Sequence, residues 1–191
     1  MTAPDSADKA VMQKTIQNDM CASGIGLFTG EKVSIKILPA EPNTGILFKR
    51  IDLPDRPVIP AHLSFVREAP RCTRLADSKA SIHMVEHLMS AFCGMGIDNA
   101  IVEVEGPEIL AADGSARLFV DLIELAGVQE QSVPRKKITI TRPIYWSEGE
   151  VHLVALPADE FRISYTLHYP QSSLLKSQFY TISVSPARFR E

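Results

Sequence analysis

The strongest constraint on the fold is a change in hydrophobic period along the chain. Residues 31–38 alternate between apolar and polar side chains, which predicts a half-buried strand. Apolar residues then recur at helical spacing from Ser81 to about residue 93 and again over 116–126, which predicts two helices. Four extended runs follow, near 137–146, 150–156, 161–169 and 178–185. The sequence therefore predicts an α+β fold whose last part consists mainly of strands.

Turn and capping residues divide the first part further. The turn-forming residues 42–45 separate the strand at 31–38 from a second apolar run at 45–51, which predicts an antiparallel hairpin. Shorter extended pieces are expected near 58–63 and 72–75, and another strand over 99–105. Ser81 is a suitable N-cap for the first helix, which Gly94 or Gly96 would end, and Gly127 is a suitable cap for the second helix.

A polar stretch with one proline marks the expected domain boundary. Residues 128–136 read as a linker between a first α+β domain over 14–127 and a second unit over 137–191, and residues 1–13 read as a loose tail. Ser185 and Pro186 have the pattern of a helix start, but few residues follow them. A sheet of this size with one open face buries little apolar surface, so the second domain is expected to be incomplete.

Composition narrows the class of partner and the cellular compartment. The 191 residues carry a net charge of −3, and Lys and Arg are dispersed, which disfavours nucleic-acid binding. No window has the roughly 18 apolar residues of a membrane span, and the N-terminus lacks the apolar segment of a secretory signal. Cys21, Cys72 and Cys93 form no C-x-x-C pair, which favours free thiols in a reducing cytoplasm.

His83, Glu86 and His87 fit the H-x-x-E-H pattern of a group of zinc peptidases. On a helix these three positions share one face, so two imidazoles and a carboxylate could meet a metal ion. A catalytic zinc normally needs three protein ligands, and a third one is not evident in the sequence. The alternative reading is the polar edge of an ordinary amphipathic helix.

Two short motifs have both a functional and a structural reading. The glycine-rich residues 23–30 could cradle a phosphate, but a strand follows them where a phosphate loop would lead into a helix, which favours a strand-to-strand turn. Residues 113–115, Asp-Gly-Ser, could be catalytic, but Asp or Ser before the second predicted helix is more simply explained as a cap.

Taken together, six ordered motifs resemble those of the UDP-3-O-acyl-N-acetylglucosamine deacetylases, the zinc amidases of lipid A biosynthesis. The motifs that carry the resemblance are Gly24-Ile25-Gly26-Leu27-Phe28-Thr29-Gly30, Asn43-Thr44-Gly45, Cys72-Thr73-Arg74-Leu75, Val85-Glu86-His87-Leu88, Gly96-Ile97-Asp98-Asn99 and Asp113-Gly114-Ser115-Ala116. The resemblance runs from about residue 14 to the end and implies a two-layer first domain of sheet and helices, followed by a second domain of which only the β-strands are present.

The resemblance also implies site residues. Glu86 matches the general base that activates water, His87 matches one zinc ligand, and Cys72 and Thr73 match a segment lining the substrate site. It implies zinc as cofactor, UDP-3-O-acyl-N-acetylglucosamine as substrate, a cytoplasmic location and a monomer, although an uncovered sheet could self-associate. On this reading His83 is not a ligand but a histidine on the helix face.

The departures from the family pattern predict a loss of activity. The H-K-x-x-D zinc-ligand motif, a Thr-Phe segment and a late histidine acting as general acid are absent from these 191 residues. Phe28 replaces a usual histidine, and Arg74 stands where a small residue is usual. We therefore expect a C-terminally truncated chain that is inactive alone. The alternatives are a non-enzymatic binding or regulatory remnant and, more distantly, an H-x-x-E-H metallopeptidase.

Overall fold

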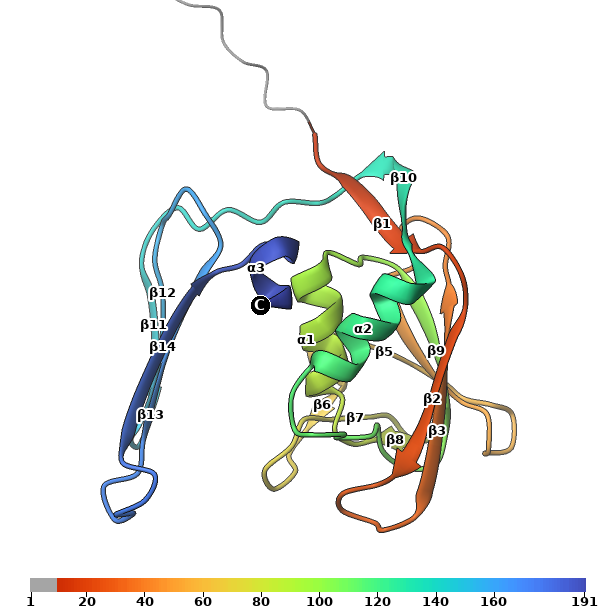
Figure 1. The fold of residues 1–191 in the computed structure, drawn as a ribbon, viewed down its shortest axis with the longest axis horizontal. Coiled ribbons are helices and arrows are strands. Elements are labelled where there is room, and N and C mark those ends of the chain that lie inside the picture. Colours follow the sequence, from red (N-terminus) through yellow and green to blue (C-terminus); the bar gives the residue numbers. More distant parts are fainter. Residues whose placement is uncertain (1–9) are drawn as a thin grey trace, which may run out of the picture. The chain divides into compact units, whose positions relative to one another are not determined.

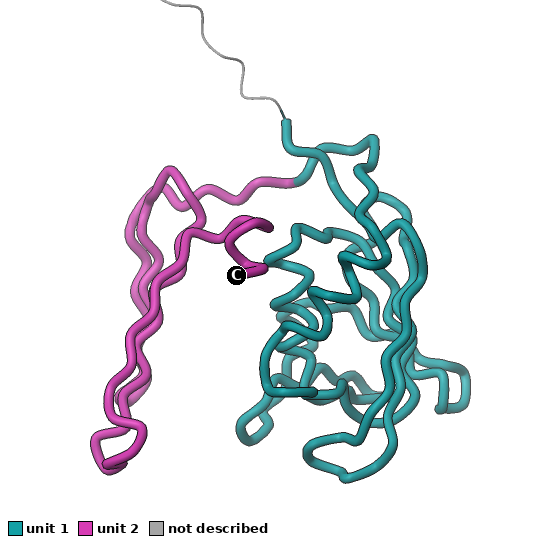
Figure 2. The backbone as a smooth tube through the Cα atoms, in the orientation of Figure 1, with its two compact units in different colours: residues 1–135 teal, residues 136–191 magenta. Residues whose placement is uncertain are grey.

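The computed structural model describes residues 10–191, which form two compact units (Figure 2). Unit 1 ends at Arg135, and unit 2 comprises residues 136–191. The chain contains α-helices, and its strands form several separate sheets, so the predicted α+β class is confirmed. The expected tail over residues 1–13 falls largely outside the described residues, but Met12 already belongs to a strand.

A five-stranded sheet forms the centre of unit 1. Its strands, in spatial order, are β2 (Met20–Ile25), β3 (Lys32–Pro39), β9 (Ala100–Glu105), β4 (Ile46–Arg50) and β5 (Val58–Pro60). β9 pairs antiparallel with β3 and parallel with β4, so the predicted hairpin between β3 and β4 is wrong. The physical reason is that Ala100, Val102 and Val104 are fully buried, and this apolar strand occupies the centre of the sheet.

Two helices cover one face of this sheet (Figure 1). α1 spans Glu86–Met95 and α2 spans Arg117–Ala126; they pack against each other and bury Phe92 and Phe119. α1 ends at Gly96 in the left-handed conformation, as predicted, and α2 ends at Gly127. The helices and the sheet are the two layers around the core of unit 1.

The start of α1 differs from the sequence-based expectation of Ser81. Residues Ser81–Ile82 form the short strand β8, which joins β6 (Val66–Arg67) and β7 (Arg74–Ala76) in a three-stranded sheet. Met84 then takes a φ of 62°, which no α-helix accommodates. A short 3-10 helix, Leu63–Phe65, precedes β6.

The expected linker over 128–136 is a strand in its larger part. β10 (Val128–Pro134) pairs antiparallel with β1 (Met12–Ile16), so these residues belong to unit 1. The boundary between the two units, after Arg135, lies within the predicted range, but the strand was not predicted. β10 is mostly exposed and carries few apolar residues, which is the composition of a loop. The pairing partner lies more than a hundred residues away, beyond the reach of a local pattern.

Asn99 fastens β1 and β10 to the sheet. It is buried, its side-chain oxygen accepts the Gly45 amide N–H at 2.8 Å, and its side-chain nitrogen donates to Gln13 and Gln131.

The neighbouring Asp98 accepts the Lys14 amide N–H and forms an ion pair with Arg135 at 2.7 Å. The sequence motifs at 43–45 and 96–99 therefore meet in space and hold the fold together.

Unit 2 consists of two separate hairpins and a short helix. The hairpins are β11 (Ile144–Glu148) with β12 (Val151–Ala155), and β13 (Arg162–His168) with β14 (Ser177–Ser183). The four runs are thus present, although the first begins at Ile144 rather than near residue 137. α3 (Pro186–Arg190) starts after Ser185, whose hydroxyl accepts the Arg188 amide N–H as predicted. No helix among residues 10–191 is long and apolar enough to cross a membrane.

Candidate functional site

Glu86 and His87 lie in the first turn of α1, whose opposite face enters the core through Leu88 and Phe92. Both polar side chains are half-buried. One oxygen of the Glu86 carboxylate, Oε2, accepts the Thr73 amide N–H at 2.9 Å. The positive end of the helix dipole also favours a negative charge at this position. The carboxylate is therefore held in place through Oε2, and its second oxygen, Oε1, has no hydrogen-bond partner among residues 10–191.

The segment with Cys72 and Thr73 lies directly beside the start of α1. The Thr73 carbonyl accepts the Val85 amide N–H at 3.4 Å, so Thr73 contacts both Val85 and Glu86. The Cys72 thiol lies 3.9 Å from Nδ1 of His83. The structure thus brings Thr73 to Glu86 and Cys72 to His83, although these pairs are separated by more than ten residues in the sequence.

His83 does not lie on the helix with Glu86 and His87, so the helical H-x-x-E-H arrangement is wrong. The amide of His83 donates to the Pro107 carbonyl at 3.0 Å, and its own carbonyl accepts the Ile109 amide N–H at 2.9 Å. This bridge to residues 107–109 fixes His83 before the helix begins. Burial, and next the nearby Arg74 guanidinium, lower the pKa of His83, which favours the neutral imidazole.

The metal implied by the resemblance can be tested against the side chains present. His87 fits one ligand position, because within residues 10–191 its imidazole has no hydrogen-bond partner and it adjoins an anchored carboxylate. Over the same range, no group of three or more His, Cys, Asp or Glu side chains is placed to hold a metal ion. His87 is thus a single candidate ligand, whereas a catalytic zinc site normally uses three protein ligands.

Glu108 is a functional candidate that the sequence analysis missed. Its carboxylate is buried and accepts hydrogen bonds from the Phe28 amide, the Thr29 amide and the Thr29 hydroxyl, at 3.2, 2.9 and 2.6 Å. Burial by itself raises the pKa of Glu108, but these hydrogen bonds outweigh burial and hold the pKa below its ordinary value. The sequence did carry a signal for this buried carboxylate, because Glu108 stands between Pro107 and the apolar residues 109–112.

This buried carboxylate explains the glycine-rich turn. Residues 26–30 connect β2 to β3, as predicted, and a Cβ atom at Gly26 would lie 2.0 Å from Oε1 of Glu108. A side chain cannot be accommodated at that distance, so the turn needs glycine at this position. The amides of the turn bind the protein's own carboxylate, which leaves the structural reading of the motif favoured over a phosphate cradle.

The Asp113-Gly114-Ser115 motif lies just before α2, whose N-cap residue is Ala116 and makes no side-chain cap bond, so the predicted capping role is met only through Ser115. The Ser115 hydroxyl accepts the Arg117 amide N–H at 3.1 Å, while Asp113 accepts both the amide and the hydroxyl of Ser115. These bonds from Ser115 lower the pKa of Asp113. The motif therefore provides a hydrogen-bond acceptor for the first backbone N–H group of the helix, a role typical of Ser and Asp at helix starts.

Comparison with known proteins identifies what this chain is similar to. The family described as UDP-3-O-acyl N-acetylglycosamine deacetylase matches residues 13–191. A UDP-3-O-acyl-N-acetylglucosamine deacetylase from Methylococcus capsulatus is 42% identical over 94% of this chain and 59% of its own length. Proteins of the same name from Chlamydia pneumoniae and Shewanella oneidensis are each 39% identical to this chain, over 94% and 90% of its length. The chain spans between 56% and 64% of the length of these three relatives.

Proposed function

Because this chain belongs to the UDP-3-O-acyl N-acetylglycosamine deacetylase family, we propose that it supplies part of the active site of a zinc-dependent UDP-3-O-acyl-N-acetylglucosamine deacetylase of lipid A biosynthesis. The observation that carries the proposal is the Glu86 carboxylate, anchored by the Thr73 amide at the start of α1 and adjacent to His87. The family is one of deacetylases, and the role of each residue is our proposal. The three free cysteines support a reducing, cytoplasmic setting.

Glu86 is the proposed general base. The Thr73 amide holds Oε2, and Oε1, which has no hydrogen-bond partner among the described residues, would take a proton from the attacking water. The separate general acid that the resemblance implies would protonate the departing amine. His87 would be one zinc ligand, and zinc, when bound, would polarise the carbonyl of the N-acetyl group as a Lewis acid. Cys72 and Thr73 would line the substrate site, because Thr73 is bonded to Val85 and Glu86 at the start of α1 and the Cys72 thiol lies beside His83.

We further propose that a polypeptide of these 191 residues does not by itself retain zinc or release acetate. The support is that one ligand is far fewer than a catalytic zinc site uses, and no cluster of three candidate ligands exists among residues 10–191. Stoichiometric zinc after dialysis of the purified 191-residue polypeptide would overturn this second proposal.

The first proposal is tested in a chimera in which residues 13–191 replace the aligned part of the Methylococcus capsulatus relative. Glu86→Gln is expected to lower kcat by about 10²- to 10⁴-fold while zinc content is unchanged. His87→Ala is expected to lower zinc content itself. Glu130→Gln, on the exposed strand β10, is the control and should change neither quantity. Full activity of the Glu86→Gln chimera would contradict the assignment of the base.

A non-enzymatic binding role is the second candidate, and Arg74 is the observation that favours it. This residue adjoins the Cys72–Thr73 segment, and its guanidinium Nε is buried without a hydrogen-bond partner among the described residues. A chimera that retains zinc but releases acetate only after Arg74→Thr would support a loss of activity at this position. A chimera equally active with Arg74 or Thr would argue against the binding role.

A further inference from the structure

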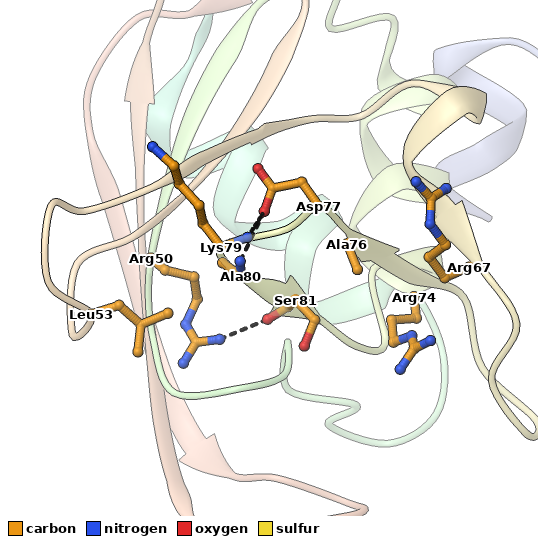
Figure 3. Close-up of a pocket in the computed structure, with 9 residues that line it drawn as sticks. All are labelled: Arg50, Leu53, Arg67, Arg74, Ala76, Asp77, Lys79, Ala80 and Ser81. Carbon is orange, nitrogen blue, oxygen red and sulfur yellow. Dashed lines mark hydrogen bonds between the residues drawn. The ribbon is translucent and has the colours of Figure 1, made fainter.

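A cleft of about 560 Å³ lies between the end of β4 and the three-stranded sheet β6–β7–β8 (Figure 3). Its charged lining residues are Arg50, Arg67, Arg74, Lys79 and Asp77. Glu86, His87, Cys72 and Thr73 do not line it, although Arg74 directly follows Thr73 in the chain. Four cations face one carboxylate here, in a chain whose overall charge is negative.

The single carboxylate does not neutralise the cleft. Asp77 accepts the amide N–H groups of Lys79 and Ala80, both at 2.8 Å, and these bonds lower its pKa. It is therefore engaged by the backbone of its own turn. Asp52, next to the cleft, is a bidentate partner of Arg50, whose guanidinium also donates to the Ser81 carbonyl at 2.6 Å. Arg50 is thus held in a fixed position at one side of the cleft, and Asp52 neutralises its charge.

The other cations have no carboxylate partner among residues 10–191. Arg67 donates only to the backbone carbonyls of Ser64 and Val66, both at 2.8 Å. Arg74 is half-buried, and its Nε is buried without any partner in the described part of the chain. A buried donor left unsatisfied costs free energy. Because this Nε is itself inaccessible, an anion would reach Arg74 through its terminal amino groups, for which no partner is found among residues 10–191.

The positive charge also acts on its surroundings. After burial, the guanidinium groups of Arg74 and Arg50 both contribute to lowering the pKa of His83. Figure 3 shows these two groups on either side of Ser81, while the Lys79 side chain points away from them. An acceptor with several oxygens would bind Arg74 and the neighbouring Ser81 hydroxyl, whereas the Arg67 side chain lines the cleft but points away from both (Figure 3).

We propose that this cleft binds a phosphate-bearing anion, with Arg74 as the central contact and Arg67 at the rim. The planar guanidinium matches the spacing of phosphate oxygens and binds them through paired N–H donors. Lys79 contributes at longer range, as a positive charge that attracts the anion. The phosphate could belong to a soluble molecule or to a lipid headgroup, and the two sources share the same chemistry.

The test uses the full 191-residue chain and two probes. Calorimetric titration with inorganic pyrophosphate examines a soluble phosphate, and co-sedimentation with phosphatidylglycerol vesicles, against phosphatidylcholine vesicles, examines a headgroup. Binding to at least one probe is expected and should weaken as NaCl is raised. Arg74→Gln should weaken it about tenfold, and Arg67→Gln roughly threefold. Pyrophosphate binding alone assigns a soluble ligand, and vesicle binding alone assigns a headgroup.

Arg117→Gln is the matched control, because Arg117 is an exposed arginine of unit 1 outside the cleft. It should leave binding within twofold of the wild type. Since Arg74 is half-buried, its variant is first checked for cooperative thermal melting; if it does not fold, the exposed Arg67→Gln variant decides. No binding to either probe, or equal weakening by Arg67→Gln and Arg117→Gln, would overturn the proposal.

Discussion

Unit 1 has a core of fully buried large apolar side chains from its strands and helices, whereas in unit 2 no side chain of these kinds is buried. Phe48, Phe92 and Phe119 are at most 1% exposed, while Tyr145 and Phe179 are 70% and 66% exposed. No residue of unit 2 is buried. Both units contain strands with an apolar face, so the difference does not lie in the strand pattern.

The difference lies in the second layer. Strand alternation creates an apolar face, but burying that face requires another element to pack on it. In unit 1, α1 and α2 provide this layer, whereas the one helix of unit 2, α3, has five residues. Isolated two-stranded hairpins are marginally stable in water. Because the apolar side chains of unit 2 are exposed, we still predict that the chain self-associates through this unit.

The largest expected effect of a single substitution is in the core of unit 1. Phe92→Ala removes a buried ring of α1 and should lower the free energy of unfolding by about 3–5 kcal/mol. Urea denaturation followed by circular dichroism measures this change.

The matched variant in unit 2 is Phe179→Ala on β14. Its ring is 66% exposed, so the same change should cost less than about 1 kcal/mol. If Phe179→Ala proved as costly as Phe92→Ala, unit 2 would bury its apolar face in solution, by self-association or otherwise, and the comparison would fail.

Elements with a strong local pattern could be predicted from the sequence. β3 follows from its alternation and α2 from its apolar stripe and its Gly127 cap. The position of β9 between β3 and β4 could not be predicted, because strand pairing depends on contacts between distant segments. The β1–β10 pair was missed for the same reason, and because polar residues such as Gln131 are satisfied there by Asn99.

The site was predicted in part. Glu86 and His87 stand out by residue type and spacing, but their position at the start of α1 was not predicted, because the apolar pattern placed the start of the helix at Ser81. The location of His83 could not, because the helical apolar pattern continues through it while the backbone turns at Met84. Glu108 and the Arg74 cleft were missed because both depend on segments that meet only in the folded chain.

A smaller effect is expected for the buried carboxylate of unit 1. Glu108→Gln should lower the free energy of unfolding at pH 7 by about 1–3 kcal/mol, because a charged acceptor of three hydrogen bonds is lost. The folded-state pKa of Glu108 lies below its ordinary value, so its contribution is present above the unfolded pKa of about 4.3 and is lost as pH falls through the folded pKa.

Urea denaturation between pH 7 and pH 3 checks this sign. The difference between the wild type and Glu108→Gln should shrink as the pH falls. Glu105→Gln, which removes an exposed carboxylate bonded to Ser34, is the control and should show little difference at any pH. A constant gap for Glu108→Gln over the whole range would show that its ionisation is not coupled to folding.

The smallest expected effect is a local one in unit 2. Gly149 connects β11 to β12 with a φ of 55°, and no atom lies within 4 Å of a Cβ built there, so substitution would strain the backbone without a clash. Gly149→Ala should cost the hairpin about 1 kcal/mol, whereas Gly149→Asn should cost less, because asparagine tolerates this conformation. Hydrogen exchange at the amides of β11 and β12 should therefore accelerate about fivefold in the alanine variant, and exchange at β9 should not change. Faster exchange at β9 would mean that the hairpin and the core of unit 1 unfold together, which contradicts the separation of stability that the two units' burial implies.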